Sequence, residues 1–336
     1  MIKKIVASFF GVVLLLGTGY VALGWGVWGH QHINRAAVFA LPAPMRTFYF
    51  NHIDYLTMEA SVPDLRKYVL SDRNEFPRHY IDVEVYGTDP FAALPMQWDE
   101  AVKKYGKDKL YKNGILPWYL QLMTAKLTDA FKEKDKAKIL FISATLAHYV
   151  GDGYQPLHTT TNYDGQLSGQ KGVHSFFESL LPEMFGRTYN LHCSPAAYYN
   201  DIPAAAWQIV KQSHALLPDL LKAEKQLLDS WPESKLYELD AKGHIKKNRY
   251  NQPWYSRAFA TAFHNNLKGM VAGQLQRAIQ TTASFWYTAW VNAGKPDLSV
   301  LDDDYTRKIN RGPLRAQYQL WQGTGHLQGI QSTAEF

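Results

Sequence analysis

The side chains of this 336-residue chain that could do chemistry gather in four short motifs within residues 25–178. Histidine, aspartate and glutamate dominate these motifs, and imidazole and carboxylate groups are suitable ligands for Zn²⁺. Cys193 is the only cysteine, which excludes a cysteine-based zinc site and an intrachain disulfide. The motifs are Trp-Gly-Val-Trp-Gly-His at 25–30, Asp64 with Pro-Arg-His-Tyr-Ile-Asp at 77–82, His-Tyr-Val-Gly-Asp and Gln-Pro-Leu-His within 148–158, and His-Ser-Phe-Phe-Glu at 174–178.

Two of the motifs place a histidine four residues before a carboxylate. On a helix, His148 and Asp152 share one face and can bind one ion, and the second pair repeats this spacing. Pro156 is expected to end the first helix, which leaves His158 free to turn toward the same cavity. A single pair of this kind is also typical of a helix surface or cap, so the order and spacing of the motifs together predict a metal centre.

Taken together, the motifs resemble those of the zinc-dependent phospholipase C and single-strand-specific secreted nuclease family. The resemblance runs from Trp25 to about Glu178, with a compatible helical remainder to about Pro296. It implies an all-α, single-domain helical bundle that holds three zinc ions in a cleft. It also implies that Trp25 is the first residue of the mature protein and binds zinc through its α-amino and carbonyl groups.

The resemblance implies one set of ligands for each of three zinc ions, with one carboxylate shared between the first and the third. The ligands are Asp64, His79, His148 and Asp152 for the first zinc, His158, His174 and Glu178 for the second, and Trp25, His30 and again Asp152 for the third. The remaining histidines are interpreted as structural or solvated.

Three clustered zinc ions suit hydrolysis of phosphate esters, because a water bridging two ions becomes hydroxide near neutral pH and can attack phosphorus. The resemblance places Asp82 in the active site, where it orients the water or contacts the substrate; the alternative is a capping or supporting carboxylate. Tyr80 is predicted to stack on a base. Asn162 and Tyr163 are candidates for a second wall and a hydrogen bond, although their sequence context favours a merely solvated loop.

Three functions remain open from the sequence. The first is a nuclease that cleaves single-stranded DNA and RNA to 5′-phosphorylated products and also acts as a 3′-nucleotidase, favoured by the five-residue gap between Trp25 and His30. The second is a phospholipase C acting on phosphatidylcholine-type lipids, favoured by Glu178 in place of the aspartate usual in the nucleases. The third is a zinc-binding envelope protein without catalysis. We expect no obligate protein partner.

The first 24 residues are predicted to be a secretory signal peptide that is cleaved after Gly24. Lys3 and Lys4 precede an apolar run, and small residues end the segment. An uncleaved membrane anchor is the alternative, since the run is nearly long enough to span. Cleavage would free the amino group of Trp25, place the protein in the periplasm or outside the cell, and lower the formal charge from +6 to +4.

The elements that position these motifs are predicted to be helices. Residues 81–86 show the only clear alternation, and residues 87–95 and 159–171 are predicted loops. We expect one catalytic domain over residues 25–297, followed by an extension over 298–336 in which the helical periodicity fades. Apolar residues recur at helical spacing in 30–41, 96–105, 118–131, 138–150, 172–180, 204–231 and 256–291.

Overall fold

The computed structural model describes residues 25–247 and 253–330, so the predicted signal peptide lies outside the described residues. Within this part the chain is mostly helical and contains no strand, only three isolated β-bridges between residues 237 and 255. This confirms the predicted all-α fold class. None of the helices in the described residues is both long and apolar enough to span a membrane.

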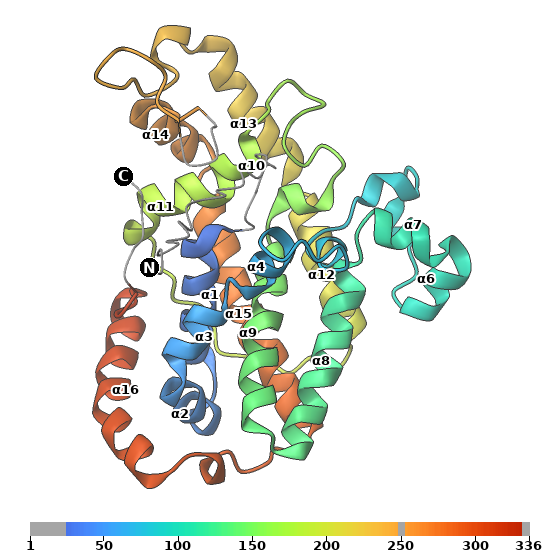
Figure 1. Cartoon of the computed structure of the whole chain (residues 1–336), viewed down its shortest axis with the longest axis vertical. Coiled ribbons are helices and arrows are strands. Elements are labelled where there is room, and N and C mark those ends of the chain that lie inside the picture. The colour runs from blue at the N-terminus through green and yellow to red at the C-terminus, as the bar shows by residue number, and fades with distance from the viewer. Residues whose placement is uncertain (1–24, 248–252, 331–336) are drawn as a thin grey trace, which may run out of the picture.

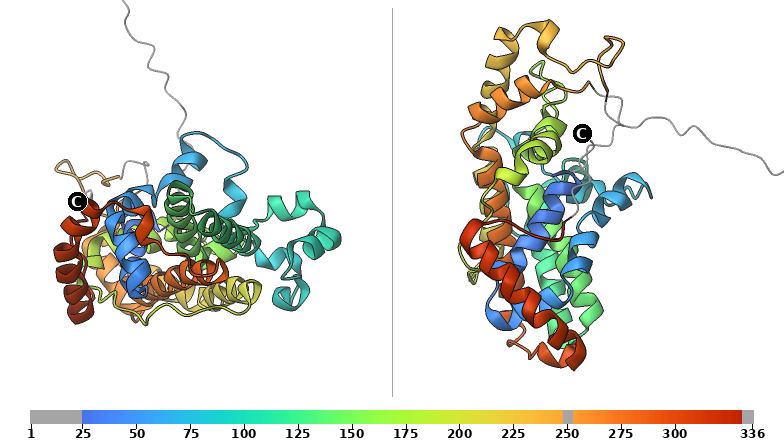
Figure 2. Two further views of the ribbon diagram at one scale, coloured as in Figure 1. Left: turned by 90° about the horizontal axis from the view of Figure 1, so that it is seen from below. Right: turned by 90° about the vertical axis from the view of Figure 1, so that its left-hand side faces the viewer.

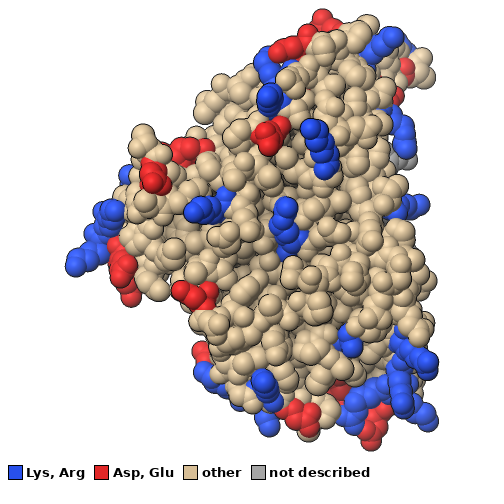
Figure 3. All heavy atoms as spheres, turned by 180° about the vertical axis from the view of Figure 1, so that it is seen from behind, with Lys and Arg blue, Asp and Glu red and all other residues tan. Residues whose placement is uncertain are grey.

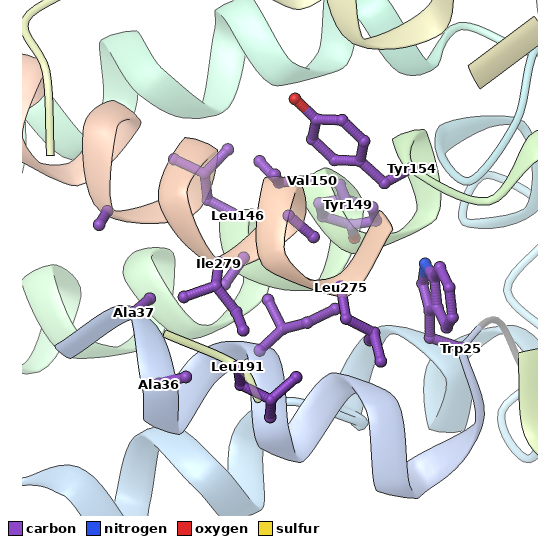
Figure 4. Packing of buried hydrophobic residues seen from close by; sticks show 14 of the residues in the cluster. Trp25, Ala36, Ala37, Leu146, Tyr149, Val150, Tyr154, Leu191, Leu275 and Ile279 are labelled. Carbon is purple, nitrogen blue, oxygen red and sulfur yellow. The ribbon is translucent and has the colours of Figure 1, made fainter. Parts of the chain in front are cut away.

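Four long helices pack side by side and form the centre of the molecule (Figure 1). Apolar residues from all four fill the space between them, and Tyr49 and Trp286 stack with 4.8 Å between ring centroids. Figure 4 shows how side chains such as Leu146, Leu275 and Ile279 interdigitate in this core. The four helices are α1 (Gly26–Ala40), α8 (Leu116–Glu133), α9 (Lys136–Gly153) and α15 (Met270–Asn292).

Shorter elements surround the central helices, and several end near the upper end of α9 (Figure 1). The further α-helices are α2 (Ala43–Asn51), α3 (Ile53–Glu59), α4 (Val62–Tyr68), α5 (Pro90–Ala93), α6 (Trp98–Tyr105), α7 (Lys107–Lys112), α10 (Val173–Ser175), α11 (Leu181–Phe185), α12 (Ile202–His214), α13 (Leu217–Ser230), α14 (Arg257–Asn266) and α16 (Asp304–Thr324). The 3₁₀ turns are η1 (Phe76–Arg78), η2 (Val83–Tyr86), η3 (Pro156–Thr159), η5 (Gly186–Thr188), η6 (Glu233–Lys235) and η7 (Ser299–Leu301), and η4 (Phe176–Leu180) is a π-helical turn.

Two predicted helices are broken in the structure. The segment 204–231 divides into α12 and α13, because Pro218 has no N–H to continue the hydrogen-bond ladder. The segment 256–291 divides into α14 and α15 at Lys268 and Gly269, which both have positive φ angles. The alternating stretch 81–86 forms the turn η2 rather than a strand.

The C-terminal extension contains a helix that the fading periodicity did not predict. Asp303 begins α16, because its carboxylate accepts a hydrogen bond of 2.7 Å from the Thr306 N–H. The helix lies along α2 at the edge of the molecule, as two views show (Figures 1 and 2). Trp321 of α16 is buried and stacks near Phe39 of α1, with 5.9 Å between ring centroids.

Candidate metal centre

Eight predicted ligand side chains come together where several helix ends meet. They come from α1, α4, the turn after η1, the last two turns of α9, η3, and the junction of α10 with η4. None of the eight is more than 5% exposed. The residues are His30, Asp64, His79, His148, Asp152, His158, His174 and Glu178.

Asp152 lies at the centre of this arrangement. Its Oδ2 atom is 2.8 Å from Nδ1 of His79 and 3.2 Å from Nε2 of His148. Its Oδ1 atom is 3.5 Å from Nε2 of His30 and 3.6 Å from Nδ1 of His158. Both oxygens therefore face nitrogen ligands from different elements, which is the geometry expected of a carboxylate that bridges two cations.

Three groups of side chains could each hold a metal ion, since their ligand atoms lie within 4.8 Å of one another. In the second group along the chain, Oδ1 of Asp64 is 3.8 Å from Nδ1 of His79. In the third group, the two Nε2 atoms of His158 and His174 are 3.2 Å apart. The groups are His30 with His148 and Asp152, Asp64 with His79 and His148, and His158 with His174 and Glu178.

Backbone carbonyls fix the tautomers of two histidines. Nδ1 of His148 donates to the carbonyl of Ala60 at 2.7 Å, and Nδ1 of His174 donates to the carbonyl of Tyr163 at 2.7 Å. Both Nε2 atoms are thus left with a lone pair directed into the centre. In known metal sites, the ring nitrogen that does not bind the metal commonly donates to such an acceptor, which orients the histidine.

Several buried polar atoms of the centre have no hydrogen-bond partner within the described residues. Leaving such an atom unpaired costs about 1–3 kcal/mol, so a concentration of them calls for a bound group. The donor set contains only imidazole nitrogens and carboxylate oxygens, which fits divalent cations. The atoms are Nδ1 and Nε2 of His30, Oδ1 of Asp64, Nε2 of His79, Oδ1 of Asp152, Nδ1 of His158 and Oε1 of Glu178.

Burial and mutual charge shift the pKa values of these groups in opposite directions. Burial, reinforced by neighbouring histidines, holds the pKa of His30 well below its usual value. Burial also raises the pKa of Glu178. For Asp152 burial acts upward, but the charges of His148 and His158 outweigh it and hold the pKa well below the usual range. Asp152 is therefore the carboxylate best kept as an anion.

Glu75 is a supporting residue that the sequence analysis missed. It is fully buried, and Oε1 lies 3.5 Å from Nε2 of His79, the ring atom opposite the one that faces Asp152. The carboxylate also accepts hydrogen bonds from the Tyr149 hydroxyl and, at 2.6 Å, from the Arg78 guanidinium. Burial acts to raise its pKa, yet these partners lower it to about 2. The spacing of four residues before His79 was the available signal.

Lys67 is the second residue that the motifs did not reveal. It lies three residues after Asp64 on α4 and is only 9% exposed. Burial raises the pKa of Asp64 and lowers that of His158, and the charge of Lys67 acts to lower both, so its ammonium group acts on two metal groups at once. Among the described residues it forms no ion pair, and its Nζ lies 4.6 Å from the centroid of the Tyr68 ring. A buried, unpaired cation beside a metal centre can bind an anionic substrate group.

Trp25 lies at the start of α1 and is fully buried. Its indole Nε1 donates to the carbonyl of Gly151 at 2.6 Å, and its own carbonyl accepts from the Gly29 N–H at 3.0 Å. A Cβ atom at Gly29 would come within 2.8 Å of the Trp25 Cβ, so a glycine is needed here. The residue is thus fixed next to Asp152, while its role as a zinc ligand stays a prediction.

Tyr80 and Asp82 lie on the segment that directly follows His79. This segment lies against η3, because the Ile81 N–H donates to the carbonyl of His158 at 2.9 Å. Burial, followed by the charge of Glu84, raises the pKa of Asp82 to about 6. Burial, with smaller effects from Asp82 and Tyr163, raises the pKa of Tyr80 to about 12, and its hydroxyl donates to the Lys112 carbonyl at 3.1 Å.

Asn162 and Tyr163 lie in the predicted loop between η3 and α10. The Asn162 side chain accepts a hydrogen bond from the Leu167 N–H at 2.7 Å and donates to Ser168 at 3.0 Å, so its polar atoms stabilise the loop. Tyr163 is 55% exposed, and its ring centroid lies 6.4 Å from that of His174. The exposed ring leaves Tyr163 available to a ligand, whereas Asn162 is already engaged.

The chain was also compared with known proteins. No protein-family model matches it, and no curated protein matches it. The function is therefore inferred from the geometry of the centre.

Proposed function

We propose that the protein is a zinc-dependent phosphodiesterase that hydrolyses single-stranded DNA and RNA. The observation that carries this proposal is the set of three buried histidine and carboxylate groups that meet around Asp152. Clustered cations that share a carboxylate suit phosphate esters as substrates. The negative charge of such an ester lies on oxygens bound to one phosphorus atom, and each ion can contact a different one of these oxygens. The third zinc additionally requires the free amino group of Trp25.

Zinc ions, when bound, lower the pKa of water and neutralise charge on a phosphate ester. The residues of the chain supply the rest. Asp152, with its low pKa, keeps a negative charge between the histidines. Lys67 offers an unpaired ammonium group to a non-bridging phosphate oxygen. Asp82, whose pKa is raised to about 6, can accept a proton near neutral pH.

The aromatic groups beside the centre support a nucleic-acid substrate. Tyr163 is a neighbour that contributes to the raised pKa of Tyr80, after burial and Asp82, and its own ring is exposed. Two rings of this kind can stack on an unpaired base next to the scissile phosphate. On the described surface seen from behind, Lys and Arg are interspersed with Asp and Glu rather than forming a continuous basic stripe (Figure 3). This face therefore offers no long footprint for a duplex.

A phospholipase C activity is the second candidate, and exposed apolar residues on α4 and directly after it favour this activity. Leu65 on α4 is 51% exposed, and Val69 and Leu70 after the helix are 71% and 72% exposed, although Asp64 on α4 belongs to the metal centre. An apolar surface beside a phosphoesterase centre suits a substrate presented by a lipid layer. Glu178 pointed to the same activity in the sequence.

The test compares both substrates on the same zinc-loaded protein that begins at Trp25. Cleavage of single-stranded DNA and RNA to 5′-phosphorylated products supports the proposal. Release of phosphocholine from phosphatidylcholine vesicles without nucleic-acid cleavage transfers the activity to the second candidate. Bound zinc without either activity contradicts both and leaves a zinc-binding protein.

A further inference from the structure

A cavity of about 420 Å³ lies at the other end of α1 from the metal centre. Its walls come from the end of α1, the start of α2, the extended segment 192–196, α15 and α16. His30 and Phe39 are nine residues apart on α1, which places the two sites about 14 Å apart along the helix. The lining includes Phe39, Arg46, His192, Ala196, Tyr318 and Trp321.

Flat rings form much of the cavity wall. Phe39, Tyr318 and Trp321 lie near one another with interplanar angles below 30°, and the Phe39 centroid is 6.5 Å from Tyr318 and 5.9 Å from Trp321. The imidazole of His192 lies 4.6 Å from the Trp321 ring centroid. Such walls favour a planar apolar ligand, and the volume falls within the range of small-molecule pockets.

The polar groups of the cavity favour a negative charge on that ligand. Arg46 places its guanidinium carbon 3.7 Å from the Tyr318 ring centroid and forms no ion pair among the described residues. No aspartate or glutamate is among the lining residues. No side chain caps the N-terminus of α2 beside Pro42, whereas the Ala40 carbonyl at the end of α1 already accepts the Ala196 N–H at 2.9 Å.

An unpaired donor completes this set. Trp321 is only 3% exposed, and its indole Nε1 has no hydrogen-bond partner among the described residues. Buried indole N–H groups usually have an acceptor, and leaving one unpaired carries a desolvation cost. An acceptor on a bound ligand would remove this cost.

We infer that this cavity binds a planar aromatic molecule that carries an anionic group. The aromatic part lies against Phe39, Tyr318 and Trp321, and the anionic group pairs with Arg46. The site is formed only when α16 packs on α1 and α2, which gives the C-terminal extension a binding role. The inference uses none of the metal ligands and stands independently of the proposed phosphodiesterase activity.

Isothermal titration with two probes tests this site: naphthalene-1-sulfonate, which is anionic, and naphthalene-1-methanol, which has the same ring without the charge. We expect one sulfonate to bind per chain, more tightly than the alcohol. Arg46→Gln should weaken sulfonate binding by about 10- to 100-fold, the range for a charge-assisted hydrogen bond, and leave alcohol binding unchanged. Arg315→Gln on the exposed face of α16 is the matched control and should bind like the parent protein.

Two more variants separate the site from the general surface. Ala196→Phe fills the cavity and should abolish binding of both probes, whereas Trp321→Phe keeps a ring, removes the indole N–H and should weaken sulfonate binding several-fold. Equal sulfonate affinity in Arg46→Gln and Arg315→Gln would overturn the inference. So would the absence of any binding at about 1 mM probe, or unchanged binding in a folded Ala196→Phe protein.

Discussion

Buried polar side chains occur in two regions of this molecule, and the two regions treat them differently. Between the central helices, most of these groups are paired within the chain, and Oδ1 of Asn34 and Oγ1 of Thr282 are the exceptions among the described residues. The Tyr49 hydroxyl and Ser143 Oγ are 2.8 Å apart, Tyr154 and Thr281 form a similar pair, and Gln274 donates to the Tyr154 carbonyl at 2.7 Å. These contacts satisfy polar groups that would otherwise destabilise the core.

At the upper end of α9, polar groups are equally buried but several of their atoms stay unpaired. Both ring nitrogens of His30 and one oxygen of Asp152 have no partner among the described residues. Most buried polar groups along α9 and α15 are paired, so the unpaired atoms concentrated at one end of α9 are a local feature of that end. The first region therefore stabilises the fold, while the second contains the side-chain groups that could hold metal ions.

The largest expected effect comes from Asp152→Asn, which removes the charge at the centre of the region with unpaired polar atoms. Activity on single-stranded DNA should be lost, and zinc content should fall by about two ions per chain, because the carboxylate is expected to bridge two of them. Elemental analysis of the dialysed variant measures the zinc. Unchanged zinc content would refute the bridging role of Asp152.

Asp82→Asn should lower kcat by about 10²- to 10⁴-fold, the usual contribution of a general base, without loss of zinc. Burial raises the pKa of Asp82 to about 6, so its carboxylate is ionised above that pH and protonated below it. Activity of the parent protein should therefore fall as the pH decreases through about 6. A pH profile measures this acid limb, and its survival in Asp82→Asn would assign the limb to another group.

Glu75→Gln tests whether the carboxylate next to His79 strengthens metal binding. The substitution keeps the size of the side chain but removes the charge that faces His79. Zinc affinity should fall by about 10- to 100-fold, as for other carboxylates behind a ligating histidine. Competition with a chelator measures the affinity, with the exposed Glu133→Gln as the matched control. Equal affinities in the two variants would show that Glu75 only stabilises the fold.

The smallest effect on zinc content and activity should come from a substitution between the central helices, where the polar groups are mostly paired. Ser143→Ala leaves the buried Tyr49 hydroxyl without its partner and should lower the free energy of unfolding by about 1–3 kcal/mol. Zinc content and activity per folded molecule should not change. Urea denaturation measures the first quantity and elemental analysis the second. A loss of zinc in Ser143→Ala would remove the distinction between the two regions.

Much of the candidate site could be predicted because its ligands follow local spacing. The pairs His148 with Asp152 and His174 with Glu178 each lie one helical turn apart, and the proline after α9 turns His158 inward. Asp64 and His79 come from separate elements, so only the resemblance predicted that they join the same centre. Lys67 and Glu75 were missed, because the burial of a charged residue on the short helix α4 or in the turn before η1 depends on neighbours that local spacing does not give.

The fold was predictable where helices are long and strongly periodic. The breaks before Pro218 and at Gly269 were missed, because apolar spacing continues across both of them. Helix α16 escaped prediction since most of its surface is exposed, and its few buried contacts, such as Trp321, depend on α1 and α2 being in place. Tertiary packing therefore determines the helices and helix ends that local periodicity does not predict.

Zinc binding is tested most directly on the purified chain beginning at Trp25, by anomalous diffraction at the zinc edge. We expect about three zinc ions, one at each of the groups around Asp152, and a loss of thermal stability when a chelator removes them. A well-folded protein that contains no metal at these groups, and whose melting temperature does not change with zinc or chelator, would show that these groups are not a metal centre.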